Sequence, residues 1–118
     1  MNTPSHPRLK LSKLRDIGWS LWDPIGLLSA QGPFTGHWDD AANHRIADEY
    51  DSYLISAASL LRGGAPPEAV ADHLARVETE HMGMPGGPET RARAEAVVAA
   101  ILADPDIWPW PDAQGRFA

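Results

Sequence analysis

Apolar side chains recur along this chain at three- and four-residue spacing, which is typical of amphipathic helices. The first stripe predicts a helix over residues 8–22, in which Gly18 lies on the apolar side and allows a close helix approach. Pro24 disfavours helical geometry at Asp23, so the helix ends there, and the Asp23 carboxylate can accept N–H bonds from the residues ahead. The residues of this stripe that we expect to be buried are Leu14, Ile17 and Leu21.

Three further stripes predict helices over residues 48–62, 66–81 and 88–103, each bounded by proline or glycine. In the last of them, Glu89 and Arg93 have the i, i+4 spacing of a surface ion pair. The apolar face of the second helix consists of Tyr50, Tyr53, Leu54, Ala57, Leu60 and Leu61. The core positions expected in the last two helices are Val70, Leu74, Val77 and Ile101.

Two segments lack helical periodicity. Residues 27–47 contain glycines and a proline, which predicts a long loop with a short helical turn near residues 39–44. The tail, residues 104–118, contains three prolines, and Trp108 and Trp110 alternate with two of them. That alternation favours an extended strip lying over the helices.

Length and composition bound the fold and exclude several classes of function. A chain of 118 residues makes one domain with one core. The sequence therefore predicts an all-α fold in a single domain over residues 1–118. We expect a compact bundle of about four helices, a flexible stretch over residues 1–7, a long loop after the first helix and an extended C-terminal tail rich in Trp and Pro. Because the chain has no Cys, disulfides, thiolate nucleophiles and thiolate zinc sites are excluded.

The charge balance bears on the kind of partner. The formal net charge is −6, which argues against nucleic acid, since phosphate binding needs a basic surface. A basic or neutral protein partner is expected instead. No apolar run approaches the ~20 residues that span a bilayer, and the first residues lack the apolar stretch of a secretory signal. We therefore expect a cytoplasmic protein without a membrane partner.

One stretch of the chain concentrates carboxylates and aromatic rings. Interfaces favour aromatic anchors, and an acidic rim raises the association rate with a basic partner. The alternative interpretation is structural: Tyr50 and Tyr53 fit core positions with their hydroxyls at the edge, and Asp48 or a neighbour fits the cap of the second helix, with Glu49 complementing its dipole. The candidate partner-binding residues are Trp38, Asp39, Asp40, Asp48, Glu49, Tyr50, Asp51 and Tyr53.

Acid–base or metal chemistry is a second alternative for these residues. His44 and Asp48 are i, i+4 neighbours if one helix spans both, and with a nearby carboxylate they make a set of hard ligands. Glu78 and His81 form a Glu-x-x-His pair, whereas di-iron bundles need two such pairs and two further Glu. We expect no cofactor, metal or catalytic residue. The alternative is a small hydrolase or metal-dependent enzyme built on His44, Asp48, Glu49, Glu78 and His81.

Three short elements resemble those of an uncharacterised family of small bacterial proteins, a domain of unknown function. They are WDPIG at residues 22–26, EYDSY at residues 49–53 and ETEHMG at residues 78–83. The resemblance covers most of residues 9–84 and implies a small helical fold and, for some members, a place beside polymorphic toxins as immunity proteins. We therefore expect a protein-binding module, an immunity-type antagonist of a co-produced toxin with a basic domain, which binds through the acidic and aromatic stretch.

Overall fold

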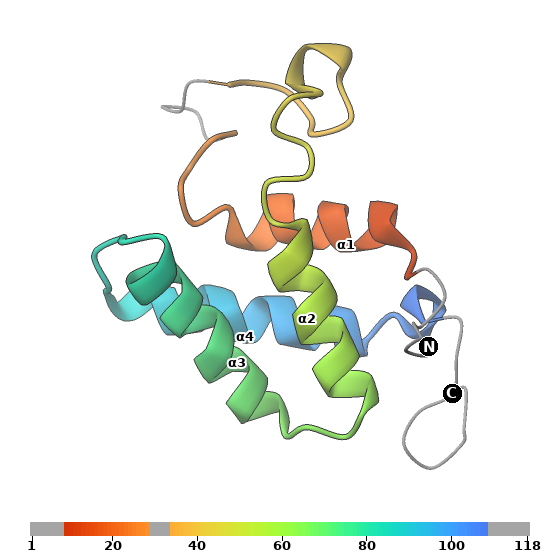
Figure 1. Ribbon diagram of the computed structural model, residues 1–118, viewed down its shortest axis with the longest axis vertical. Helices are drawn as coiled ribbons and strands as arrows, with labels where there is room; N and C mark the ends of the chain where they lie inside the picture. Colours follow the sequence, from red (N-terminus) through yellow and green to blue (C-terminus); the bar gives the residue numbers. More distant parts are fainter. Residues whose placement is uncertain (1–8, 29–33, 109–118) are drawn as a thin grey trace, which may run out of the picture.

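The chain folds into an all-α structure, as predicted. A computed structural model describes residues 9–28 and 34–108, and within these ranges helices are joined by turns and loops, with no strand. In Figure 1, α2 and α3 lie side by side, α4 passes behind them, and α1 crosses the upper end of α2. The four α-helices are α1 (Leu11–Ile17), α2 (Asp51–Arg62), α3 (Pro67–Arg76) and α4 (Pro88–Leu102).

The first predicted helix begins a little late and changes character before it ends. α1 continues directly into a π-helical segment, η1 (Gly18–Trp22). A π turn takes in one more residue than an α turn, so the apolar face is displaced by about one position beyond residue 17. Trp22 therefore enters the core. Leu21, which was predicted to be buried, is 40% exposed, and Ile17 is only partly buried.

α2 begins three residues later than predicted, because residues 44–50 form successive turns with i, i+3 hydrogen bonds. The predicted helix cap at Asp48 is therefore wrong: Tyr50 precedes the helix, and no side chain caps it. The predicted close approach at Gly18 is confirmed, since a Cβ at this position would lie 2.6 Å from Leu54 Cδ1. Leu60, which was placed on the apolar face, is exposed.

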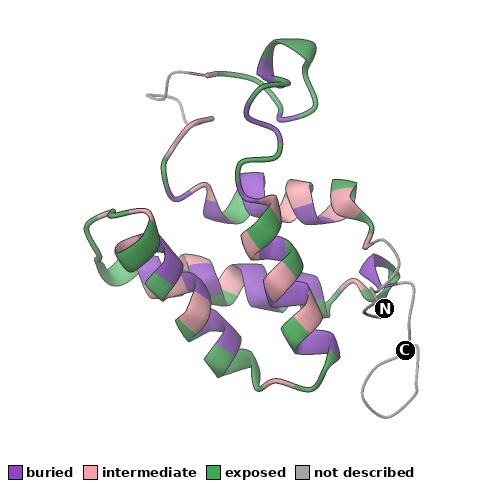
Figure 2. Ribbon diagram, viewed as in Figure 1, coloured by how far each residue is buried: buried purple, intermediate pink, exposed green. Residues whose placement is uncertain are grey.

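The last two predicted helices are found close to their expected bounds. α3 ends in a second π-helical segment, η3 (Val77–His81), and α4 follows after a loop. α3 and α4 make the most extensive contact between elements. The core lies where the helices face one another (Figure 2). Its members include the predicted residues Leu14, Leu54, Leu61, Val70, Leu74, Val77 and Ile101.

One carboxylate lies inside this core. Glu78 is 1% exposed, and its Oε2 accepts hydrogen bonds from Thr90 Oγ1 at 3.0 Å and from Arg93 Nη2 at 2.6 Å. The predicted pair of Arg93 with Glu89 is therefore wrong. A buried carboxylate attracts the guanidinium more strongly than an exposed one, because the core screens the charges less than water does.

The described start of the tail, residues 104–108, contains a short 3-10 turn where an extended strip was predicted. Asp104 Oδ1 accepts a hydrogen bond from the backbone N–H of Asp106 and starts the 3-10 turn η4 (Pro105–Ile107), whose first position suits proline. Trp108 is buried, and its Nε1 donates to the carbonyl of Ala58 at 2.9 Å. Trp110 lies outside the described residues. Within the described part of the chain, no helix is long and apolar enough to cross a membrane.

Candidate functional site

The segment between α1 and α2 stands out from the helical bundle. Residues 34–49, called the acidic segment below, form the part of the chain that projects at the top of Figure 1. The segment has one short 3-10 turn, η2 (Ala41–Asn43), where a helical turn was predicted. It carries four of the candidate partner-binding residues as exposed side chains. These are Asp39, Asp40, Asp48 and Glu49.

Buried side chains hold the acidic segment in a defined conformation. Asn43 is 2% exposed, and its Nδ2 donates to the carbonyls of Thr35 at 2.9 Å and His37 at 2.7 Å. Trp38 Nε1 donates to Asp16 Oδ1 on α1 at 2.7 Å. These hydrogen bonds pair polar groups within the protein, whereas in a mobile loop the same groups would bond to water. The acidic segment is therefore a structured surface, although it contains little regular helix.

A second tryptophan joins the acidic segment to the bundle. Trp19 Nε1, in η1, donates to the carbonyl of Ala47 at 3.3 Å, and Ile46 is buried beside this contact region. At the opposite end of the segment, Asp40 Oδ2 accepts the backbone N–H of His37 at 2.9 Å. The first bond fixes the end of the segment to η1, and the second fixes a turn within the segment.

The candidate carboxylates fall into two groups. Among residues 9–28 and 34–108, no hydrogen bond or ion pair uses the carboxylates of Asp39, Asp48 and Glu49. Asp51 instead forms a forked ion pair with Arg15, through Nε at 3.0 Å and Nη2 at 2.6 Å. The hydrogen bond from Arg15 to Asp51 is the main reason that the pKa of Arg15 is raised. Asp51 therefore ties α2 to α1, whereas the other three remain open to a partner.

The predicted aromatic anchors lie mostly inside the protein. Trp38 is 8% exposed and Tyr50 is fully buried, so both belong to the core, which was the structural interpretation of Tyr50. Neither ring can reach a partner without unfolding its surroundings. Tyr53 is half-buried and contacts Trp22 and His81, each with ring centroids 6.2 Å apart.

Tyr50 forms a buried polar connection that the sequence pattern did not predict. Its hydroxyl donates to Asp23 Oδ1 at 2.7 Å and accepts the backbone N–H of Ile25 at 3.3 Å. As predicted, Asp23 also accepts N–H bonds from the residues ahead, Leu27 at 2.9 Å and Leu28 at 3.0 Å. The pKa of Tyr50 is raised mainly by burial and secondly by the hydrogen bond to Asp23. The WDPIG and EYDSY elements therefore meet in space.

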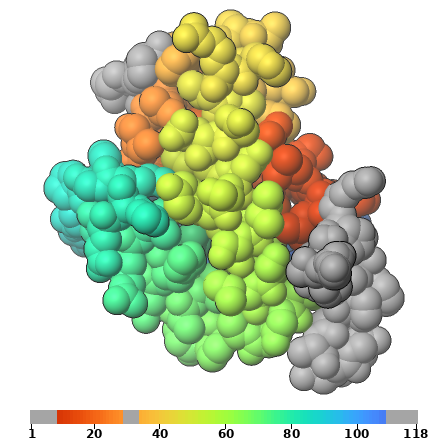
Figure 3. Space-filling model, viewed as in Figure 1, coloured from red at the N-terminus to blue at the C-terminus, as the bar shows by residue number. Residues whose placement is uncertain are grey.

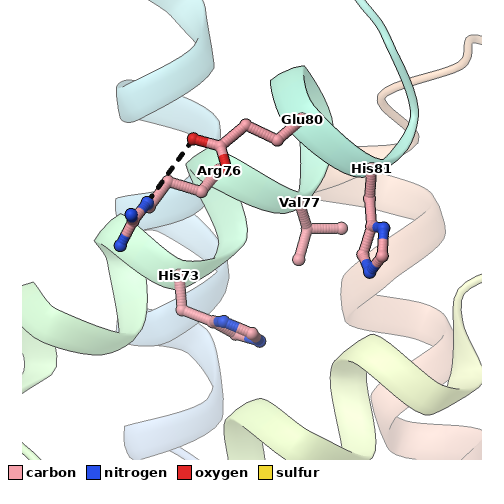
Figure 4. Close-up of a pocket in the computed structure, with 5 residues that line it drawn as sticks. All are labelled: His73, Arg76, Val77, Glu80 and His81. Atoms are coloured by element: carbon pink, nitrogen blue, oxygen red, sulfur yellow. Dashed lines mark ion pairs between the residues drawn. The ribbon is translucent and has the colours of Figure 1, made fainter.

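A groove near Tyr53 is lined by two histidines, His73 and His81. It has a volume of about 400 Å³, and Figure 4 shows its lining residues. His73, Val77 and His81 point to one side of the helix, whereas Arg76 and Glu80 pair with each other at 3.6 Å. The two imidazoles are two helical turns apart on one helix, so they cannot ligate one ion.

The residues of the enzyme alternative do not meet at one site. His44 and Asp48 line a hollow of about 330 Å³ together with Arg15 and Arg45. His81 lines the separate histidine groove, and Glu78 is buried against α4. The described residues bring together no group of three His, Asp or Glu side chains that could hold a metal ion. A shared acid–base or metal centre therefore lacks geometric support.

Comparison of the chain with models of protein families, with curated proteins and with solved structures finds no match. Functional inference for this protein therefore depends on its own residues, and the acidic segment is the candidate site that its geometry supports best.

Proposed function

We propose that this protein is a protein-binding module that antagonises a basic partner, as an immunity protein for a co-produced toxin, and that it binds through the acidic segment. The observation that carries the proposal is the set of open carboxylates on a structured segment. Asp39, Asp48 and Glu49 are exposed, and their carboxylates make no hydrogen bond or ion pair with the described residues. Their charge is therefore available to lysine and arginine side chains of a partner.

The structure of the acidic segment supports binding for two reasons. A segment that is already ordered loses little conformational entropy when it binds, so more of the interaction energy appears as affinity. Clustered charges of one sign also steer a partner of opposite charge and raise the association rate. The net charge of −6 adds to this field. A basic protein surface fits both features.

The burial pattern divides the candidate residues by role. The exposed carboxylates are the proposed contacts. Trp38 and Tyr50 act from inside, because Trp38 holds the acidic segment against α1 and Tyr50 holds the start of α2 against the turn after η1. Asp51 has the same supporting role through Arg15. These residues position the contact surface without touching the partner.

Capture of partners from the native host, followed by kinetics, tests the proposal. The tagged full chain is used as bait, and the recovered protein is measured against the variant Asp48→Lys/Glu49→Lys. We expect a lower association rate, with a loss that shrinks in added salt because exposed charges are screened over ~8 Å at physiological ionic strength. Thermal melting should barely change, since exposed substitutions shift stability by less than about 0.5 kcal/mol.

A matched variant separates local recognition from net charge. Glu89→Lys/Asp106→Lys changes the net charge by the same amount at exposed positions on α4 and η4, away from the acidic segment. This control should bind nearly as the unaltered protein does. Equal association rates for the two variants would contradict recognition by the acidic segment.

A further inference from the structure

The outward face of α2 differs chemically from that of α3. From Ser52 to Leu61 no residue is charged, although α2 lies uncovered in the middle of one face of the molecule (Figure 3). α3, which lies beside it, has charged side chains at its exposed positions Glu68, Asp72 and Arg76. A helix that faces only water usually turns charged residues outward, and interface cores are depleted of charge.

The uncharged residues form a continuous strip with the spacing of a helix-packing seam. They occupy relative positions i, i+3, i+4, i+7 and i+8, the rows along which one helix packs against another. Ile55 is 39% exposed and Leu60 is 43% exposed, and both are large apolar side chains. We call this set the α2 strip. It consists of Ser52, Ile55, Ser56, Ser59 and Leu60.

The serines of the α2 strip make it suitable for close contact. Their small side chains let a second helix approach α2, because the distance between packed helices depends on the side chains at the contact. A helical serine hydroxyl can also donate to the carbonyl four residues earlier. The hydroxyls of Ser56 and Ser59 can therefore each find an acceptor within α2 or its first turn when a second helix covers them.

The α2 strip is continuous with the acidic segment. Asp48 and Glu49 are exposed immediately before the first turn of α2, so one end of the strip is acidic. The other end has no matching basic charge at its surface, since Arg62 is buried with its guanidinium 4.8 Å from the Trp108 ring centroid. The combined surface is acidic at one end and uncharged along its length.

We infer that the partner places an amphipathic helix along the α2 strip, with its apolar and small residues on the strip and basic residues at the end that meets Asp48 and Glu49. This inference rests on the proposed function, because the acidic end is shared with the proposed recognition site. A second copy of this chain is a poorer occupant, since the α2 strip carries no basic residue to meet the acidic end.

Selection from a library of helical peptides tests the inference even while the partner is unidentified. The probes are phage-displayed peptides of about 18 residues. As helices they are longer than α2, whose 12 residues span ~18 Å. The target is the full chain. We expect the selected peptides to combine an apolar strip with lysine or arginine at one end, and to perturb the backbone amide resonances of α2.

Variants then locate the bound peptide. Ile55→Glu and Leu60→Glu should each raise its Kd by about tenfold or more, as loss of a central interface contact does. Leu102→Glu is the matched control, because Leu102 is a comparably exposed leucine on α4. It should change the Kd by less than about twofold. The strip variants should change it by about tenfold, which corresponds to ~1.4 kcal/mol of binding free energy. All three positions are exposed, and thermal melts report whether each variant is folded.

The outcomes separate this inference from the proposed function. Peptides that need Asp48 and Glu49 but bind the Ile55→Glu and Leu60→Glu variants normally would overturn the α2 strip and leave the acidic segment as the site. Peptides that need the strip but tolerate charge reversal at both carboxylates would overturn the proposed function and the basic end assigned to the partner.

Two further outcomes would overturn the α2 strip. One is the recovery of no binding peptide, or only of peptides that Leu102→Glu weakens. The other is self-association of the full chain in sedimentation equilibrium that Ile55→Glu abolishes, because the strip would then be occupied by a second copy.

Discussion

The hydroxyl of Tyr50 donates a hydrogen bond of 2.7 Å to the Asp23 carboxylate, which joins the start of α2 to the turn after η1. Asp23 has a left-handed backbone, with φ 30° and ψ 59°, a conformation that only glycine adopts freely and that Asp and Asn tolerate better than other residues. Its carboxylate also accepts two backbone N–H bonds. The hydrogen bonds offset the backbone strain, so the orientation of the acidic segment depends on this pair.

Tyr50→Phe should destabilise the protein while preserving the shape of the core. The substitution removes the hydroxyl and leaves Asp23 with its backbone donors, and hydrogen bonds to charged groups contribute about 1.5–3 kcal/mol. We expect a loss of unfolding free energy of that size in urea denaturation. Tyr53→Phe is the control, because no described residue hydrogen-bonds to the half-buried Tyr53 hydroxyl. An equal loss in both variants would contradict the role of the Tyr50–Asp23 pair.

The Tyr50 phenol should also make stability fall at alkaline pH. Burial and the Asp23 carboxylate raise the pKa of Tyr50 in the folded protein above the unfolded value of about 10. Above pH ~10 the unfolded chain binds fewer protons than the folded protein, so the unfolding free energy decreases by up to ~1.4 kcal/mol per pH unit. Below that pH the contribution is fully present. Urea denaturation from pH 8 to 11, compared with Tyr50→Phe, measures the difference, which should be constant below ~pH 10 and shrink above it.

The helices could be predicted because each has both a periodic apolar face and a chemical boundary. α3 illustrates this: Pro67 starts it, and Val70 and Leu74 are buried at helical spacing. The π turns could not be predicted in the same way. Hydrophobic spacing assumes an α turn throughout, so the displacement at η1 moved Leu21 out of the core and brought Trp22 in.

The candidate site could be predicted only in part. The exposure of Asp48 and Glu49 follows from a local concentration of charge, which the sequence displays directly. The partners of Tyr50 and Arg93 depend on long-range packing instead: Tyr50 pairs with Asp23, and Arg93 turns to Glu78 in the core. Short-range spacing rules describe only neighbours within one helix, so they cannot identify such pairs.

Gly18→Ala should destabilise the contact between η1 and α2. A Cβ at residue 18 would lie 2.6 Å from Leu54 Cδ1, so the leucine or the helix must shift, and overpacking of this kind costs about 1–3 kcal/mol. Thermal melting measures the loss. Gly63→Ala is the control, since its Cβ would meet only backbone oxygens at 3.5 Å and beyond, at ordinary contact distance.

A compensating substitution tests the same contact from the other side. Leu54→Val shortens the side chain that the added Cβ would strike, so its combination with Gly18→Ala should cost less than the sum of the two single changes. Strict additivity in the double-variant cycle would mean that the predicted clash does not occur.

The ion pair between the buried Glu78 and the partly exposed Arg93 should respond to single and paired substitutions in opposite ways. Arg93→Met leaves the buried Glu78 carboxylate with only Thr90 as a donor. Breaking a fully buried ion pair from one side costs about 3–5 kcal/mol, and because the Arg93 side chain is 34% exposed we expect a loss at or below the lower end of that range. Glu78→Met/Arg93→Met replaces both charges by apolar side chains of similar length, so much of that stability should return. Urea denaturation of the single and double variants measures both effects.

The surface carboxylate that the sequence pattern assigns to Arg93 provides the control for that experiment. Glu89 is exposed in the first turn of α4, and Glu89→Ala should change the unfolding free energy by less than about 0.5 kcal/mol. If Glu89→Ala proved as destabilising as Arg93→Met, Arg93 would be engaged at the surface of α4 in solution. The double variant would then show no recovery, because Glu78 and Arg93 would be acting independently.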